Sequence, residues 1–106
     1  MPDNERLCAL AQAGDAAARE LLIENNLGFI RRTALEVCGK AGESGLDVDD
    51  LVQEGCIGLL SAIDRFDAEH GMKFLTYAAP AIRNAMTDCA RAALSQFERR
   101  LEFDGL

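Results

Sequence analysis

The chain has 106 residues, enough for one small domain, and 49% of them are hydrophobic, which supports a modest core. Two prolines, no tryptophan and abundant alanine and leucine favour an all-α fold. No run is long and apolar enough to span a bilayer, and the first residues do not read as a signal peptide, so we expect a cytoplasmic protein.

The net charge of −7 argues against a general nucleic-acid-binding protein, but the charge is unevenly distributed. Residues 1–70 hold six basic and fourteen acidic side chains, whereas residues 71–100 hold five basic and two acidic ones. An acidic bulk with a basic carboxyl-terminal segment indicates two different partners. The alternative is a chance clustering of charge in a short chain.

Metal and catalytic chemistry find little support in the sequence. Among the candidate metal ligands, His70 is the single histidine and the four cysteines form no C-x-x-C pair: Cys8, Cys38, Cys56 and Cys89. A zinc site needs clustered ligands, so we interpret the cysteines as reduced, buried thiols. The motifs of P-loop, zinc-protease and serine-hydrolase sites are also missing. We therefore expect no enzyme activity, no metal and no other cofactor.

Two helices are predicted first. Asn4 is expected to cap a helix at about 5–12, and Asp15 the helix that follows Gly14. Asn25 and Asn26 predict a kink or a restart, because asparagine side chains compete for backbone hydrogen bonds.

A further helix is predicted at about 27–39. The apolar residues of its buried face are Leu27, Ile30, Ala34, Val37 and Cys38. The segment 40–45, KAGESG, predicts a loop and is the best candidate for disorder.

Asp47 is expected to cap a helix that ends near Phe66, in which Gly55 permits a close crossing with another helix. Its predicted core stripe consists of Val52, Cys56, Leu59, Ile63 and Phe66. Its opposite face consists of Asp50, Gln53, Glu54, Ile57, Ser61 and Asp64. An apolar centre with a charged rim is typical of a protein-docking patch. A solvated face with one exposed isoleucine is the alternative.

After a turn at 67–71, in which Gly71 can adopt a positive φ, a long helix should reach about Arg100. Pro80 leaves two alternatives, a regular helix that begins near 76–79 or a helix kinked at the proline. The final residues, LEFDGL, supply no closing element, so we expect a fragment of a longer chain.

Basic and aromatic side chains occur together in this last segment. They are Lys73, Phe74, Tyr77, Arg83, Arg91, Phe97, Arg99 and Arg100. Unpaired bases stack on aromatic rings while basic groups neutralise phosphates, so the segment is a candidate for nucleic-acid binding. The alternative, favoured by spacing alone, is that Phe74 and Tyr77 pack into the core.

Residues 50–78, DLVQEGCIGLLSAIDRFDAEHGMKFLTYA, resemble region 2 of the sigma-70 family of bacterial RNA polymerase sigma factors. The blocks D-L-x-Q-E-G-x-I-G-L, A-x-D-R-F-D and K-F-x-T-Y-A occur in the family's order and spacing, and ENNLGFIRRTALEV resembles its N-L-x-x-V helix. The resemblance covers most of 15–95. It implies a single all-α bundle of about four to five helices, with a core at about 15–100 and without regions 3 and 4.

The resemblance implies two partners. The D-L-x-Q-E-G helix would bind the clamp-helix coiled coil of the polymerase β′ subunit through Asp50, Gln53, Glu54, Cys56, Ile57 and Leu60. The next helix would recognise and melt the promoter minus-ten element and trap unpaired bases of the non-template strand. The matching residues, with the basic ones of that helix, are Lys73, Phe74, Thr76, Tyr77, Arg83, Asn84, Thr87 and Arg91.

The chain also departs from the family's primary members. Pro80 and Ala81 stand in place of a Trp-Trp pair, Met72 in place of an aromatic residue, and Asp88 where a basic residue is common. T-Y-A-x-P resembles the sporulation and stress-response branch, which implies an alternative sigma factor with weaker or differently arranged melting. A second hypothesis is a diverged protein–protein module that binds polymerase or an anti-sigma factor without melting DNA.

Overall fold

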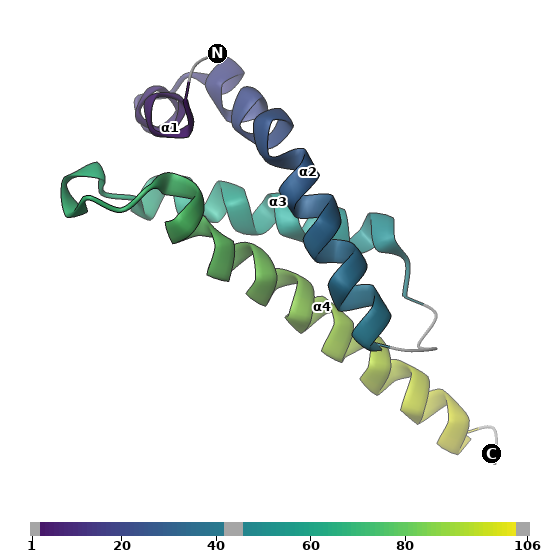
Figure 1. Cartoon of the computed structure of the whole chain (residues 1–106). Helices are drawn as coiled ribbons and strands as arrows, with labels where there is room; N and C mark the ends of the chain where they lie inside the picture. The colour runs from purple at the N-terminus through teal and green to yellow at the C-terminus, as the bar shows by residue number, and fades with distance from the viewer. Residues whose placement is uncertain (1–2, 42–45, 104–106) are drawn as a thin grey trace.

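The fold is a bundle of four α-helices (Figure 1). The computed structural model describes residues 3–41 and 46–103. Its elements are α1 (Asn4–Gln12), α2 (Ala16–Ala41), α3 (Val48–Arg65), the short 3-10 helix η1 (Ala68–His70) and α4 (Phe74–Phe103). The described ranges contain no strand, so the prediction of an all-α bundle is confirmed. Of the loop predicted at 40–45, residues 40 and 41 belong instead to the end of α2, and residues 42–45 lie outside the described ranges.

Short polar side chains begin the helices. The carboxylate of Asp15 accepts a hydrogen bond from the backbone N–H of Ala18 (3.2 Å), and that of Asp47 accepts one from Asp49 (2.9 Å). Both predicted caps are therefore confirmed. The cap of α1 is Asp3, whose side chain accepts from the N–H of Arg6, so the prediction for Asn4 is wrong by one residue.

Asn26 lies inside the unbroken helix α2, where we predicted a kink or a restart. Its buried amide donates to the carbonyl of Leu22 (2.7 Å) and exchanges two hydrogen bonds with the amide of Asn4 (3.0 and 3.1 Å). Because its polar groups are paired, this asparagine does not need to break the helix. The prediction of an interruption is wrong, and the amide pair joins α1 to α2.

The core draws on all four α-helices. Its largest fully buried side chains include Leu7, Leu22, Ile30, Leu51, Leu59, Ile63, Phe74, Ile82 and Met86. Of the predicted stripe on α3, Leu59, Ile63 and Phe66 are buried, whereas Val52 and Cys56 are only partly buried. The buried face of α3 is therefore rotated about the helix axis from the predicted one, so that it includes Leu51 in place of Val52.

At Gly58, α3 lies close to the backbone of α4. A Cβ atom there would lie 2.7 Å from the carbonyl oxygen of Ala81 and 3.0 Å from the Cα of Ile82. Gly55, to which we assigned a close crossing, is also tightly surrounded, but by the side chains of Met86 and Ile30. Two neighbouring glycines therefore let α3 and α4 pack closely along one face.

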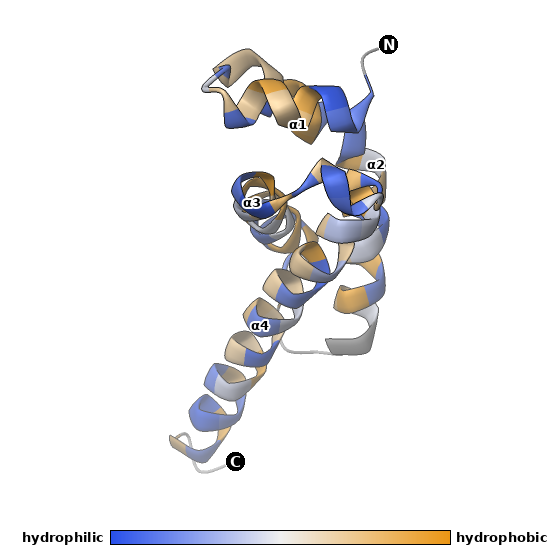
Figure 2. Ribbon diagram, turned by 90° about the vertical axis from the view of Figure 1, so that its left-hand side faces the viewer, coloured by the Kyte–Doolittle hydropathy of each residue, from blue (hydrophilic) through white to orange (hydrophobic). Residues whose placement is uncertain are grey.

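The connection from α3 to α4 contains the predicted left-handed residue, since Gly71 has a φ of 73°. α4 begins at Phe74 and continues through Pro80, so the alternative of a helix start at 76–79 is wrong. Its carboxyl-terminal half extends away from the other helices (Figures 1 and 2), and the molecule measures 54 × 22 × 22 Å. Within the described ranges no helix is long and apolar enough to cross a membrane.

Candidate functional site

The predicted docking residues all lie on α3 and include its most exposed apolar side chain. Ile57 is 58% exposed, Asp50 and Gln53 are also exposed, and Glu54 is half-buried. Cys56 and Leu60 are half-buried and pack against the core. This α3 face is therefore apolar at its centre and acidic at its rim, which is the composition expected of a docking patch.

Cys89 lies on α4 and was not assigned to this site from the sequence, but charges of the α3 face act on its thiol. Burial is the main cause that raises the pKa of the Cys89 thiol, and the carboxylates of Glu54 and Asp50 raise it further. Glu54 is half-buried, so its side chain is less exposed than helical geometry alone suggested. Burial also raises the pKa of Cys56, so both thiols stay protonated at neutral pH.

The predicted DNA-facing residues lie on or just before α4, but their exposure differs. Five of them are exposed: Lys73, Thr76, Arg83, Asn84 and Arg91. Thr87 is half-buried, and its hydroxyl donates to the carbonyl of Arg83 (2.9 Å). The guanidinium of Arg83 also lies 3.3 Å from the carboxylate of Glu36 on α2, so this cation has a partner inside the molecule.

Phe74 and Tyr77 belong to one aromatic cluster with Phe66. Phe74 is fully buried and packs edge-to-face on Phe66, with ring centroids 5.4 Å apart. Tyr77 is half-buried, and its ring centroid lies 5.6 Å from that of Phe66. Phe74 packs into the core, as its spacing favoured, so its ring is not accessible to DNA in this structure. Tyr77 keeps part of its surface exposed.

Two hollows border the ring of Tyr77, and Arg65 lines both. One, of about 240 Å³, is lined also by Ser61, Pro80 and Asn84, and the other, of about 340 Å³, by His70 and Met72. A planar base can stack on an aromatic ring while a guanidinium meets its phosphate. Sequence reasoning missed Arg65 as a site residue, although the A-x-D-R-F-D block contains it.

A third, wider hollow of about 810 Å³ lies between α1, α2 and the beginning of α4. Lys73 and Thr76 line one part of it, and the amides of Asn4 and Asn25 line another. Asp3, Glu5 and Glu24 add carboxylates, which disfavour phosphate, while the amide of Asn25 can pair with a base edge. The sequence did not associate α1 or α2 with this site.

No group of His, Cys, Asp or Glu side chains within 3–41 and 46–103 is arranged to hold a metal ion. The side chains of the two surfaces offer apolar contact and charge on α3, and stacking and hydrogen bonding beside Tyr77.

Comparison with known proteins gives a match to the family model of sigma-70 region 2 over residues 22–95. The RNA polymerase sigma-G factor of Bacillus subtilis (strain 168) is 48% identical over 73 residues, which cover 69% of this chain and 26% of that protein. The sigma-F factor of the same organism is 42% identical over 78 residues, or 74% of this chain and 29% of that protein.

The RNA polymerase sigma-28 factor of Bacillus thuringiensis subsp. kurstaki is 42% identical over 82 residues, or 77% of this chain and 33% of that protein. The chain spans from about a quarter to about half of the length of the curated relatives it matches first. The α1 helix precedes the residues that the family model matches.

Proposed function

Because this chain belongs to the sigma-70 region 2 family, in its sporulation-like branch of alternative sigma factors, we propose that it joins RNA polymerase to a promoter during transcription initiation. The α3 face binds the clamp helices of the β′ subunit. The surface of α4 beside Tyr77 holds unpaired bases of the non-template strand at the minus-ten element. This domain is the polymerase-binding and base-capturing part of a sigma factor.

The observation that carries the proposal is the exposed Ile57 on an acidic helix face. An isoleucine that is 58% exposed leaves apolar area in water, and covering it with a partner is favourable. The carboxylates of Asp50 and Glu54 suit a partner with a basic surface. All three residues lie within the matched segment 22–95.

Calorimetric titration of the chain with a β′ clamp-helix fragment tests the docking surface. Glu54→Lys is expected to weaken binding by about tenfold or more, because it places a like charge against a basic partner. Ile57→Ser is expected to weaken binding because apolar contact with the partner is lost. The substitution should leave the core intact, since Ile57 is exposed. Glu20→Lys on the exposed side of α2 changes the net charge equally and should bind like the wild type.

Because Glu54 is half-buried, the folding of its variant must be checked by thermal unfolding. If both folded variants, Glu54→Lys and Ile57→Ser, bind the fragment with wild-type affinity, the docking proposal is wrong.

Base capture is supported by the half-buried ring of Tyr77 between two hollows. Tyr77→Ala is expected to weaken binding of a labelled single-stranded oligonucleotide by about tenfold or more, since one stacked base contributes about 1–3 kcal/mol. Tyr77→Phe keeps the ring and its contact with Phe66, so it should retain most of the affinity. Equal binding by all three chains would contradict base capture.

A second candidate function is a protein-docking module that does not melt DNA. Three observations favour it: Phe74 is buried, Pro80 and Ala81 replace the family's Trp pair, and the net charge is −7. In that case Tyr77→Ala would leave promoter opening unchanged in a full transcription assay, while Glu54→Lys would still weaken docking, either on polymerase or on an anti-sigma factor.

A further inference from the structure

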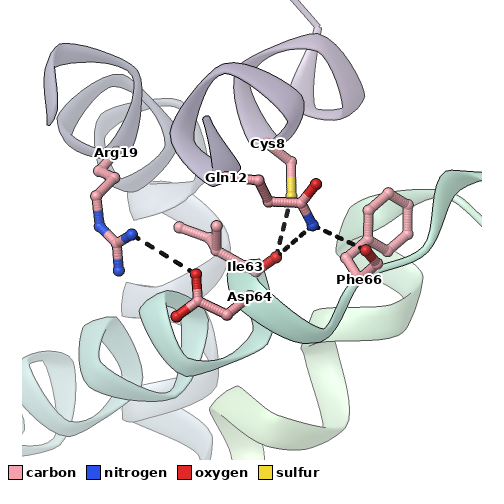
Figure 3. A network of polar contacts seen from close by, with 6 residues as sticks. All are labelled: Cys8, Gln12, Arg19, Ile63, Asp64 and Phe66. Carbon is pink, nitrogen blue, oxygen red and sulfur yellow. Dashed lines mark hydrogen bonds and ion pairs between the residues drawn. The ribbon is translucent and has the colours of Figure 1, made fainter. Parts of the chain in front are cut away.

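The α1 helix contacts the carboxyl-terminal end of α3 through the side chains of Gln12 and Cys8. The amide nitrogen of Gln12 donates to the carbonyl oxygens of Ile63 (2.7 Å) and Phe66 (2.8 Å), as Figure 3 shows. The Cys8 thiol lies 3.6 Å from the same Ile63 oxygen. The last carbonyls of a helix lack hydrogen-bond donors from their own helix, so the amide of Gln12 supplies a donor at the end of α3.

The same helix contacts the beginning of α4. The carboxylate of Glu5 accepts a hydrogen bond from the backbone N–H of Phe74 (3.2 Å), the first residue of α4. The first N–H groups of a helix have no internal acceptor, and a negative charge there suits the helix dipole. Glu5 and Gln12 lie about two turns apart on α1, so one face of one helix meets both ends of the connection 67–73.

The residues fixed in this way are those that support Tyr77. Phe66, whose carbonyl binds Gln12, carries the ring that touches both Phe74 and Tyr77. Phe74, whose N–H binds Glu5, lies one turn before Tyr77 on α4. Between them, His70 and Met72 line the hollow of about 340 Å³ beside the Tyr77 ring.

We propose that α1 is a positioning element for base capture, in which Gln12 and Glu5 fix the two ends of the connection 67–73 and thereby the ring of Tyr77 and its hollow. This inference rests on the proposed function. Neither residue touches the bases. Without either contact the connection moves, the hollow loses its shape and unpaired DNA binds more weakly, while the exposed α3 face is unaffected.

Other contacts keep α1 in place when one of these side chains is changed. Leu7, Cys8 and Ala11 are buried in the core, and the amides of Asn4 and Asn26 are paired. The variants Gln12→Ala and Glu5→Ala should therefore fold, which makes a loss of DNA binding interpretable.

The test uses the whole chain and three measurements. These are the affinity for a labelled single strand of roughly 12 nucleotides, the affinity for the β′ clamp-helix fragment, and the quenching of tyrosine fluorescence by acrylamide. The chain has one tyrosine and no tryptophan, so its fluorescence reports Tyr77 alone.

For Gln12→Ala we expect weaker binding of the single strand, by about fivefold, easier quenching of Tyr77, and unchanged binding of the clamp-helix fragment. Gln96→Ala, which removes an exposed glutamine from α4, should match the wild type in all three measurements.

Glu5 also lines the acidic hollow of about 810 Å³, so removing its charge could by itself favour DNA. The comparison is therefore between Glu5→Gln and Glu5→Ala, which are both uncharged, while only glutamine keeps an oxygen that can accept from Phe74. We expect Glu5→Gln to bind the single strand at least as well as the wild type and Glu5→Ala to bind it several-fold more weakly than Glu5→Gln.

Two results would overturn the inference. One is wild-type affinity for the single strand and wild-type quenching in both alanine variants. The other is a parallel loss of single-strand and clamp-fragment binding with a lower melting temperature, which would mean that α1 only stabilises the fold. If the wild type binds no single strand, base capture is wrong, and the positioning of Tyr77 then depends on quenching alone: a change in Gln12→Ala supports it and no change refutes it.

Discussion

At the scale of single residues, Cys8 is the side chain with the most perturbed chemistry. It is fully buried in the core, and its pKa is raised to about 11, chiefly by burial and further by the charges of Asp64 and Glu5. An unfolded thiol titrates near its ordinary value of 9.0. The folded chain therefore keeps this proton over a range of pH in which the unfolded chain loses it.

The pH dependence of stability follows from that difference. Below pH 9 the contribution of Cys8 to the free energy of unfolding is fully present, and it is lost as pH rises through about 11. Urea unfolding of the wild type and of Cys8→Ala at several pH values is the measurement. As the pH rises from 9 to about 11, the free energy of unfolding of the wild type should fall by about 2 kcal/mol more than that of the variant. Parallel pH profiles would show that the thiol does not titrate in this way.

Much of the residue-scale chemistry could be predicted from the sequence. Asp15 and Asp47 cap helices and Gly71 forms a turn through interactions with residues next to them in the chain, so a short stretch of sequence is enough to predict these roles. Asn26 is different, because its partner Asn4 lies on another helix. The sequence indicates that an asparagine tends to break a helix. It does not show that a residue 22 positions away will pair with the hydrogen-bonding groups of the asparagine side chain.

At the scale of elements, the crossing of α3 and α4 depends on Gly58. Gly58→Ala is expected to lower the free energy of unfolding by about 1–3 kcal/mol, because the added Cβ would meet the Ala81 carbonyl oxygen, which belongs to the backbone and cannot easily move. Gly28→Ala in α2 is the matched control. Nothing lies within 4 Å of a Cβ there, so this change should raise stability by about 0.5–1 kcal/mol.

Thermal and urea unfolding followed by circular dichroism measure both variants. A Gly58→Ala chain as stable as Gly28→Ala would mean that α3 and α4 separate at little cost, and the close crossing would then not matter for stability.

Helical periodicity predicted the outward direction of Asp50, Gln53 and Ile57, because exposure on one helix follows from its 3.6-residue repeat. Periodicity could not decide which of two glycines meets the α4 backbone. It also could not predict the hollows beside Tyr77, because Arg65 and Met72 reach that ring only through the tertiary course of the connection 67–73. The burial of Phe74 depends on the same connection.

At the scale of the whole molecule, the net charge of −7 opposes binding to DNA, and part of the basic surface is already paired. Arg83 on α4 and Glu36 on α2 form an ion pair at 3.3 Å, with about half of each side chain exposed. Such an exposed pair adds little to stability. Its larger effect is that a phosphate must compete with Glu36 for the guanidinium.

We therefore expect Glu36→Gln to strengthen binding of single-stranded DNA about two- to threefold at low salt and to steepen its salt dependence by less than one released ion. Glu20→Gln, with the same change of charge on the same helix, should have a smaller effect because it frees no arginine. Titrations at several salt concentrations measure both. For every chain the binding should be weak and should fall with added salt; tight, salt-insensitive binding to duplex DNA would contradict this electrostatic account.

The long helix α4 spans two physical environments. Up to Ala90 its inner face is buried against the bundle, whereas every described residue from Arg91 to Phe103 is exposed or only partly covered. An isolated helix of that length is marginal in water. Backbone amides before Ala90 should therefore exchange with solvent only when the bundle opens, and those beyond it through local fraying. The cooperative folding unit thus ends near Ala90, while the helix itself continues to Phe103.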